Sequence, residues 1–273
     1  MKMTYDFLER NNGMCKVIAI VNQKGGVAKT TTTVNLGIGL VNEGKRVLLI
    51  DSDSQGSLSS CLGVAEPDEL DVTLPTIMSK IMNDEEFDNT LGVLKHEEGI
   101  SFLPCNIELS GLEVSMVSMM RREFILSEYV EKVRDLYDFI LIDCNSSLGM
   151  MTMNALTTAD SIIIPIQAAY LSVKGLQQLI TTISKTKKYL NPDLGIEGIL
   201  FTMMDSRTNY AREIKQLVEN SYGKNVRVFD SVIPFSVRAS ETSAEGVSIF
   251  KHDPKGKVAT AYKNLVKEVL NYE

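Results

Sequence analysis

Short runs of apolar, mostly β-branched residues alternate along the chain with longer segments in which apolar residues recur every three or four positions. The short runs predict strands buried on both faces, and the longer segments predict amphipathic helices. Strands are predicted at residues 16–21, 46–50, 100–103, 139–142, 161–167, 195–202 and 226–233. Helices are predicted at residues 30–43, 75–82, 121–136, 148–158, 174–190, 209–222 and 256–271. The alternation predicts an α/β fold with a mainly parallel twisted sheet and helices on both faces.

A glycine-rich segment, NQKGGVAKTT at residues 22–31, joins the first predicted strand to the first predicted helix. Backbone N–H groups of such a loop, together with the helix N-terminus, bind phosphate. Gly25 and Gly26 lack Cβ atoms where the backbone must wrap around an anion. We expect Lys29 to neutralise phosphate charge and the Thr30 hydroxyl to ligate Mg²⁺. The nucleotide-binding residues predicted in this loop are Lys24, Gly25, Gly26, Val27, Ala28, Lys29, Thr30 and Thr31.

Aspartates follow two of the predicted strands. Asp51 and Asp53 come after the second strand, and Asp143 ends the strand at 139–142. Because ligands of parallel sheets sit at the carboxyl ends of the strands, these residues should converge with the loop. Asp143 and Asp51 are therefore predicted to hold Mg²⁺, directly or through water, together with Thr30. Asp53 is the candidate for positioning or deprotonating the attacking water, although an aspartate in such a turn is also a common turn residue.

The composition is that of an ordinary globular protein. The 273 residues are 44% hydrophobic and 23% charged, and no run of about 18 apolar residues predicts a membrane span. Residues 1–15 lack the apolar core of a secretory signal and are predicted to be a short extension before a single domain at 16–273. The four cysteines have no C-x-x-C spacing, so we expect thiols in a reducing cytoplasm rather than a metal or redox site.

The charge is unevenly distributed along the chain. Residues 66–135 contain 16 acidic and 6 basic residues, whereas residues 205–273 contain 9 acidic and 11 basic residues. The formal net charge is −7. Any contact with nucleic acid is therefore expected to use a local basic face rather than the overall charge.

The loop departs from the ordinary pattern G-x-x-x-x-G-K-S/T, whose two glycine positions fall on Gln23 and Ala28. It has instead an additional lysine, Lys24, and its form KGGxxKTT resembles the deviant Walker motif of the ParA/MinD ATPases. Further segments resemble motifs of the Soj/ParA partition ATPases: GKRVLLIDSDSQG at 44–56, DCNSSLG at 143–149, TMMDSRTN at 202–209 and VIPFSVRASE at 232–241. The resemblance extends from about residue 16 to the C-terminus and is weakest over 58–135.

This resemblance implies that ATP and Mg²⁺ drive formation of a sandwich homodimer, which binds double-stranded DNA without sequence preference. A ParB-type centromere-binding partner then stimulates hydrolysis, and the protein is cytoplasmic and nucleoid-associated. Lys24 is the predicted catalytic cation, supplied to the nucleotide of the other subunit. Because lysine lacks the bidentate fork of arginine, hydrolysis is expected to be slow and dependent on dimerisation. The resemblance also implies that Pro234 contacts adenine and that Arg207 and Arg238 bind DNA.

Several positions differ from the family pattern. Ala28 replaces a loop glycine, Ser54 replaces a proline, Asn145 and Ser146 replace a proline pair, and Phe235 replaces an arginine. Their effects on hydrolysis and DNA affinity are left open by the sequence.

Other functions fit the same fold. A MinD-like, membrane-associated positioning ATPase would require a basic amphipathic C-terminal helix. The segment 263–273 is short and ends acidic, so we expect it to pack on the sheet and expect no membrane association. An iron–sulfur reductase would need a cysteine pair at the dimer face, and neither Cys105 nor Cys144 is an obvious member of one. A non-catalytic, ATP-gated DNA-binding module is disfavoured by Lys29 and Asp53.

Overall fold

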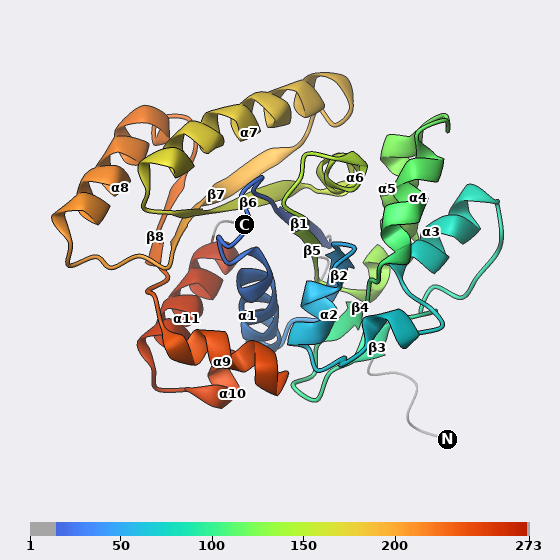
Figure 1. Ribbon diagram of the computed structural model, residues 1–273, viewed down its shortest axis with the longest axis horizontal. Coiled ribbons are helices and arrows are strands. Elements are labelled where there is room, and N and C mark those ends of the chain that lie inside the picture. Colours follow the sequence, from blue (N-terminus) through green and yellow to red (C-terminus); the bar gives the residue numbers. More distant parts are fainter. Residues whose placement is uncertain (1–14, 272–273) are drawn as a thin grey trace.

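The computed structural model describes residues 15–271. Its strands are β1 Lys16–Ile20, β2 Val47–Ser52, β3 Leu94–Lys95, β4 Ser101–Leu103, β5 Phe139–Cys144, β6 Ser161–Gln167, β7 Gly195–Thr202 and β8 Val228–Val232. They form one sheet in the order β3-β4-β2-β5-β1-β6-β7-β8, in which every neighbouring pair except β3 and β4 is parallel (Figure 1). The predicted mainly parallel sheet is confirmed. The predicted N-terminal extension lies, apart from Cys15, outside the described residues.

Helices cover both faces of this sheet (Figure 1). They are α1 Lys29–Asn42, α2 Ser57–Cys61, α3 Leu74–Met82, α4 Glu108–Met116, α5 Ile125–Val133, α6 Met150–Thr158, α7 Tyr170–Tyr189, α8 Asn209–Tyr222, α9 Val237–Glu245, α10 Ile249–His252 and α11 Lys257–Leu270, with single 3-10 turns at Pro67–Glu69, Arg122–Phe124 and Arg134–Leu136. Successive side chains of a strand point to opposite faces. Val17 and Ala19 therefore pack with α5 and α6, whereas Ile18 and Ile20 pack with α1 and α11. Within residues 15–271, no helix is long and apolar enough to cross a membrane.

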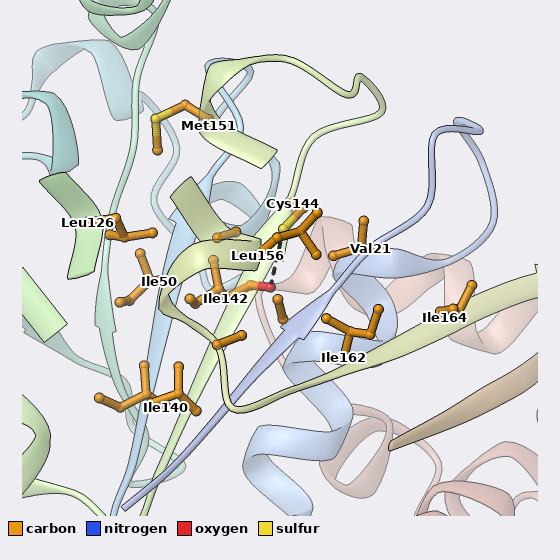
Figure 2. Packing of buried hydrophobic residues seen from close by; sticks show 14 of the residues in the cluster. Val21, Ile50, Leu126, Ile140, Ile142, Cys144, Met151, Leu156, Ile162 and Ile164 are labelled. Atoms are coloured by element: carbon orange, nitrogen blue, oxygen red, sulfur yellow. Dashed lines mark hydrogen bonds between the residues drawn. The ribbon is translucent and has the colours of Figure 1, made fainter. Parts of the chain in front are cut away.

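The central strands are fixed by apolar packing. Figure 2 shows Ile140 and Ile142 of β5 and Ile162 of β6 in one cluster with Leu126 of α5 and Leu156 of α6. All five side chains are fully buried. Burying one aliphatic side chain of this size contributes roughly 1.5–3 kcal/mol. The packed strands therefore give the residues at their carboxyl ends a rigid support.

The two edges of the sheet are protected in different ways. At one edge, β3 is only two residues long. At the other edge, the Glu268 carboxylate on α11 accepts hydrogen bonds from the backbone N–H groups of Asp230 (3.0 Å) and Ser231 (2.8 Å) in β8. Short strands and covered backbone groups both disfavour pairing with a further strand.

Most predicted elements are present, with shifts at their ends. The predicted helix at 121–136 is the α5 helix flanked by two 3-10 turns, and the predicted helix at 174–190 begins earlier, at Tyr170. The strand predicted at 139–142 continues to Cys144, so that Asp143 lies inside β5 in register with Asp51 of β2. The hydrophobic pattern did not predict β3, α2, α4, α9 or α10. Four of these are very short or polar, and α4 exposes Val114, so that its apolar residues do not form one face.

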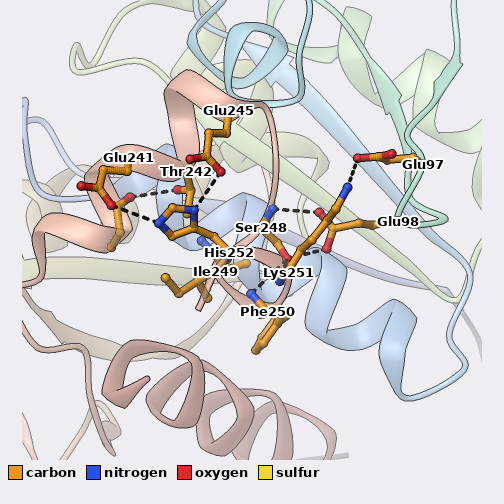
Figure 3. A network of polar contacts seen from close by, with 12 residues as sticks. Glu97, Glu98, Glu241, Thr242, Glu245, Ser248, Ile249, Phe250, Lys251 and His252 are labelled. Atoms are coloured by element: carbon orange, nitrogen blue, oxygen red, sulfur yellow. Dashed lines mark hydrogen bonds and ion pairs between the residues drawn. The ribbon is translucent and has the colours of Figure 1, made fainter. Parts of the chain in front are cut away.

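A polar network joins the turn between β3 and β4 to the short helices before α11 (Figure 3). The Glu98 carboxylate accepts hydrogen bonds from the backbone N–H of Ser248, at 2.8 Å, and from its hydroxyl group. Lys251 forms an ion pair with Glu97. These contacts hold α10 against the edge of the sheet.

His252 joins α10 to α9 through both of its ring nitrogens (Figure 3). Nδ1 lies 2.8 Å from Glu245 Oε2, and Nε2 lies 3.0 Å from Glu241 Oε2. A neutral imidazole has only one N–H group, so both contacts are hydrogen bonds only when the ring is protonated. Accordingly, hydrogen bonding to Glu245 and Glu241 raises the pKa of His252 above its usual value.

Replacement of His252 by glutamine is expected to lower the thermal unfolding temperature more at pH 6 than at pH 8. The stabilisation linked to the raised pKa is fully present below the unfolded-state pKa of about 6.5, and it is lost as the pH rises through the folded-state pKa. Scanning calorimetry at several pH values measures this difference. Lys251→Gln is the control, because its ion pair with Glu97 does not titrate in this range. If His252→Gln lowered the unfolding temperature by the same amount at every pH, as expected for the control, the prediction would be contradicted.

Candidate nucleotide-binding site

The glycine-rich loop lies between β1 and α1, at the carboxyl end of a central strand. Side chains from the ends of β6 and β7 hold it in place. The Gln167 side-chain amide donates to the Gly26 carbonyl oxygen at 2.9 Å, and the Thr202 hydroxyl donates to the Val27 carbonyl oxygen at 3.0 Å. Both contacts use carbonyl oxygens, so they fix the loop without using its N–H groups.

Ala28 has a left-handed backbone conformation, with φ 61° and ψ 37°. For a residue with a Cβ atom this conformation costs roughly 1–2 kcal/mol. The sequence left open whether this position tolerates alanine. In the structure Ala28 adopts the left-handed conformation, which glycine adopts more readily. The loop therefore keeps a glycine-like path into α1 despite the substitution.

Lys29, the first residue of α1, is only 7% exposed. Its ammonium donates to Ser146 Oγ at 2.8 Å and to the Lys24 carbonyl oxygen at 3.2 Å. Burial lowers the pKa of Lys29, and the charge of Asp143 opposes this shift. The loop thus contains a buried cation at the point where phosphate binding was predicted.

Lys24, the second lysine of the loop, is half-buried and lies near the first turns of α7. Its neighbour Gln23 donates a side-chain hydrogen bond to the Gly175 carbonyl oxygen at 3.0 Å. The two lysines therefore differ in environment, because Lys29 is enclosed by the loop and Lys24 lies against a neighbouring helix.

Asp143 is brought next to Thr30, as the sequence predicted. The Thr30 hydroxyl donates to Asp143 Oδ2 at 2.7 Å, and the Thr33 hydroxyl lies 3.1 Å from Oδ1. Burial raises the pKa of Asp143 to about 6, although hydrogen bonds from Thr30 and Thr33 oppose the shift. Thr33 was not predicted, and its position one helical turn after Thr30 is the signal that could have identified it.

Asp51 is fully buried and faces α2. One carboxylate oxygen accepts hydrogen bonds from Ser59 N (3.0 Å) and Ser59 Oγ (2.8 Å), and the other accepts one from Asp53 N at 3.2 Å. Burial, followed by the charge of the adjacent Asp143, raises the pKa of Asp51 to about 7. Ser59 was missed because its contact depends on the tertiary position of α2. The metal-binding role of Asp51 stays a prediction.

Asp53 begins the turn that leads into α2. Its carboxylate accepts a hydrogen bond from Gln55 N at 3.1 Å, and its carbonyl oxygen accepts one from Gly56 N at 2.9 Å. The charge of Asp53 acts on the pKa of both Lys29 and Asp143, which places it in the same electrostatic environment. Its side chain therefore both stabilises a turn and lies near the predicted phosphate site.

A cavity of about 220 Å³ adjoins the loop at the start of α1. It is lined by residues that include Ala28, Thr31, Met203, Pro234, Ser240 and Tyr262. Pro234 is thus on the wall of a cavity that opens beside the glycine-rich loop, and its contact with adenine stays a prediction.

The two predicted DNA-binding arginines lie in segments that follow β7 and β8. Arg207 is 90% exposed, and its guanidinium donates two hydrogen bonds to Asp205, at 2.7 and 2.8 Å. Arg238 is exposed on α9. Phe235, which stands where the family pattern has arginine, is also exposed.

A glycine-rich loop at the carboxyl edge of a parallel sheet, with a buried lysine and a threonine bonded to a strand-end aspartate, defines a P-loop nucleotide-binding protein. A family model described as an AAA domain matches residues 15–196. The chain belongs to the Soj/ParA family of chromosome-partitioning ATPases. The family predicted from the loop and strand-end motifs is thereby confirmed.

Two relatives illustrate the similarity. The chain is 42% identical to the sporulation initiation inhibitor protein Soj of Bacillus subtilis, over 94% of this chain and 98% of Soj. It is 40% identical to the chromosome partitioning protein ParA of Myxococcus xanthus, over 93% of this chain and 88% of that protein.

Among solved structures, the chain is similar to cobyrinic acid a,c-diamide synthase from Mycobacterium smegmatis with a bound ATP analogue and magnesium. The TM-score is 0.83 and the sequence identity 35%, over 94% of this chain and 95% of that one. The likeness confirms the P-loop α/β fold.

Proposed function

We propose that this protein is an ATP-dependent DNA-partition ATPase. ATP binding with Mg²⁺ drives sandwich dimerisation, the dimer binds double-stranded DNA without sequence preference, and hydrolysis stimulated by a ParB-type partner resets it. The observation that carries the proposal is the arrangement of Lys29, Thr30 and Asp143 around the glycine-rich loop. Membership of the Soj/ParA family supports a cytoplasmic, nucleoid-associated protein of this kind.

The donor set beside the loop fits Mg²⁺. The hydroxyl of Thr30 and the carboxylate of Asp143 are 2.7 Å apart, and hard oxygen ligands of this kind suit a cation that retains several waters. Bound magnesium would neutralise phosphate charge. Thr30 and Asp143 would hold it, with Asp51 acting from the next strand, and Lys29 would contact the β- and γ-phosphates.

Hydrolysis requires a positioned water and a counter-charge for the γ-phosphate. Asp53 is assigned to the water, because its carboxylate is half-buried and its charge acts on Lys29. Lys24 is assigned to the nucleotide of the other subunit, since it lies against α7 and not inside the loop that surrounds Lys29. Pro234 and the cavity beside Ala28 are assigned to adenine.

Phosphate release from Mg²⁺–ATP, measured with and without DNA, tests this function. Slow release is expected, together with a dimer in light scattering when a non-hydrolysable ATP analogue is present. A protein that stays monomeric with the analogue would contradict the proposal. Liposome flotation in the presence of ATP would instead favour the MinD-like alternative.

Arg238→Glu is expected to weaken DNA binding without changing nucleotide affinity. Arg238 is preferred for the test because Arg207 is already paired with Asp205. Loss of one phosphate contact in each subunit should reduce the slope of log affinity against log salt by about one unit per subunit, equally for all DNA sequences. Fluorescence anisotropy across a salt series measures the slope.

Lys188→Glu, a charge reversal near the C-terminal end of α7, is the matched control and should leave the slope unchanged. Equal loss of nucleotide and DNA affinity in Arg238→Glu would indicate a folding defect. Unchanged DNA affinity and salt slope would contradict the assignment of Arg238.

A further inference from the structure

Ser146 places its hydroxyl on the ammonium of the loop lysine. It belongs to residues 145–149, which connect β5 to α6, and its Oγ atom lies 2.8 Å from Lys29 Nζ. Ser146 is itself exposed, whereas Lys29 is buried. A lysine ammonium has three protons, and two of those of Lys29 are directed to Ser146 and to the Lys24 carbonyl oxygen.

The remainder of this connecting segment is held by its own side chains. Asn145 Oδ1 accepts hydrogen bonds from the N–H and the hydroxyl of Ser147, each at 3.0 Å, and from the Thr152 hydroxyl at 3.1 Å. The Ser147 hydroxyl oxygen in turn accepts one from Gly149 N at 3.2 Å. These contacts stay within the segment and the start of α6, whereas the contact of Ser146 reaches the glycine-rich loop.

We propose that Ser146 is a positioning residue that competes with nucleotide phosphate for the ammonium of Lys29. The inference rests on the proposed function, in which Lys29 serves the β- and γ-phosphates. A phosphate oxygen is a charged acceptor and forms a stronger hydrogen bond with the ammonium than a serine hydroxyl does. Phosphate reaches the buried ammonium from the exposed side, which the Ser146 hydroxyl occupies, so its binding displaces Ser146 and frees residues 145–149 from the loop.

The competition depends on the residue type at this position. A proline, as in the family pattern, has no hydroxyl and fixes its own φ, so it could neither occupy Lys29 nor be released in this way. In this chain a serine makes the contact. Because the segment follows Asp143 directly and leads into α6, its release would transmit phosphate occupancy from the loop to the adjacent helix.

Titration calorimetry with Mg²⁺–ADP tests the competition on the full-length protein. Ser146→Ala removes the competing hydroxyl and is expected to bind ADP about 3- to 10-fold more tightly than wild type, the effect of one partly exposed hydrogen bond to a charged group. Ser146→Thr keeps a hydroxyl and should bind like wild type. Ser147→Ala is the matched control and should also bind like wild type, because its hydroxyl bonds within the segment. Equal or weaker ADP binding by Ser146→Ala would overturn the proposal.

Amide hydrogen exchange supplies a second measurement that does not require nucleotide. In the protein without nucleotide, Ser146→Ala should exchange faster than wild type over residues 145–149, and ADP should accelerate exchange there in wild type only. If wild type bound no ADP, the proposed function would fail. The exchange rates of wild type and Ser146→Ala without nucleotide would still show whether Ser146 holds residues 145–149 to the loop. Identical exchange in the two proteins would overturn the inference.

Discussion

Replacing Lys29 by alanine is expected to reduce the affinity for ATP and ADP by about 100-fold or more. The ammonium is buried at the start of α1, where it is the cation enclosed by the glycine-rich loop. Removing one partner of a buried, hydrogen-bonded charge pair costs about 2–5 kcal/mol. The free energy of nucleotide binding should become less favourable by an amount in this range. Titration calorimetry or a fluorescent nucleotide measures the loss directly.

Lys24→Ala is the matched control, because it removes the same type of side chain from the same loop. Lys24 lies against α7 rather than inside the loop, so the variant should keep its affinity for ADP and lose ATP turnover. Wild-type nucleotide affinity in Lys29→Ala would refute the assignment of this lysine. A similar loss of ADP affinity in both variants would show that Lys24 acts on the nucleotide of its own subunit.

Asp53→Ala is expected to form an ATP-bound dimer that does not turn over. Loss of a residue that positions or deprotonates the attacking water lowers the rate by about 10²–10⁴-fold, while ATP affinity should change little because Lys29 and Thr30 are intact. Single-turnover phosphate release gives the rate, and light scattering with ATP gives the oligomeric state.

Asp53→Asn separates catalysis from the structural role of this residue. The asparagine amide oxygen can still accept the hydrogen bond from Gln55 N that stabilises the turn, but the side chain has no negative charge. If the carboxylate acts on water, the asparagine variant should be as inactive as the alanine variant. Wild-type turnover in Asp53→Asn would mean that Asp53 serves only the turn.

The central part of the fold could be predicted because its signals are local. A β-branched run, a glycine-rich segment and a helical apolar period follow one another between residues 16 and 43, and each has a distinct spacing. The parallel sheet then places the strand ends at one edge, which is why Asp143 could be expected beside Thr30. The contact between these two residues needs no information beyond strand order.

The contacts around this centre could not be predicted in the same way. Ser59 reaches Asp51 only because α2, a helix of five residues, turns back toward β2. Ser146 reaches Lys29 across more than a hundred residues of chain, and no periodicity links the two. The left-handed conformation of Ala28 was indicated only by its place at a loop glycine position, since alanine itself carries no signal for it. Short helices and hydrogen bonds between distant residues depend on the assembled fold.

Glu268 has a consequence for how copies of this protein can associate. By accepting the backbone N–H groups of two successive β8 residues, its carboxylate occupies donors of the edge strand. Growth of a continuous intermolecular sheet from that side is therefore disfavoured, as it is beside the two-residue β3. A dimer of the kind proposed above would therefore use side-chain surfaces, such as the one around the glycine-rich loop, rather than a shared sheet.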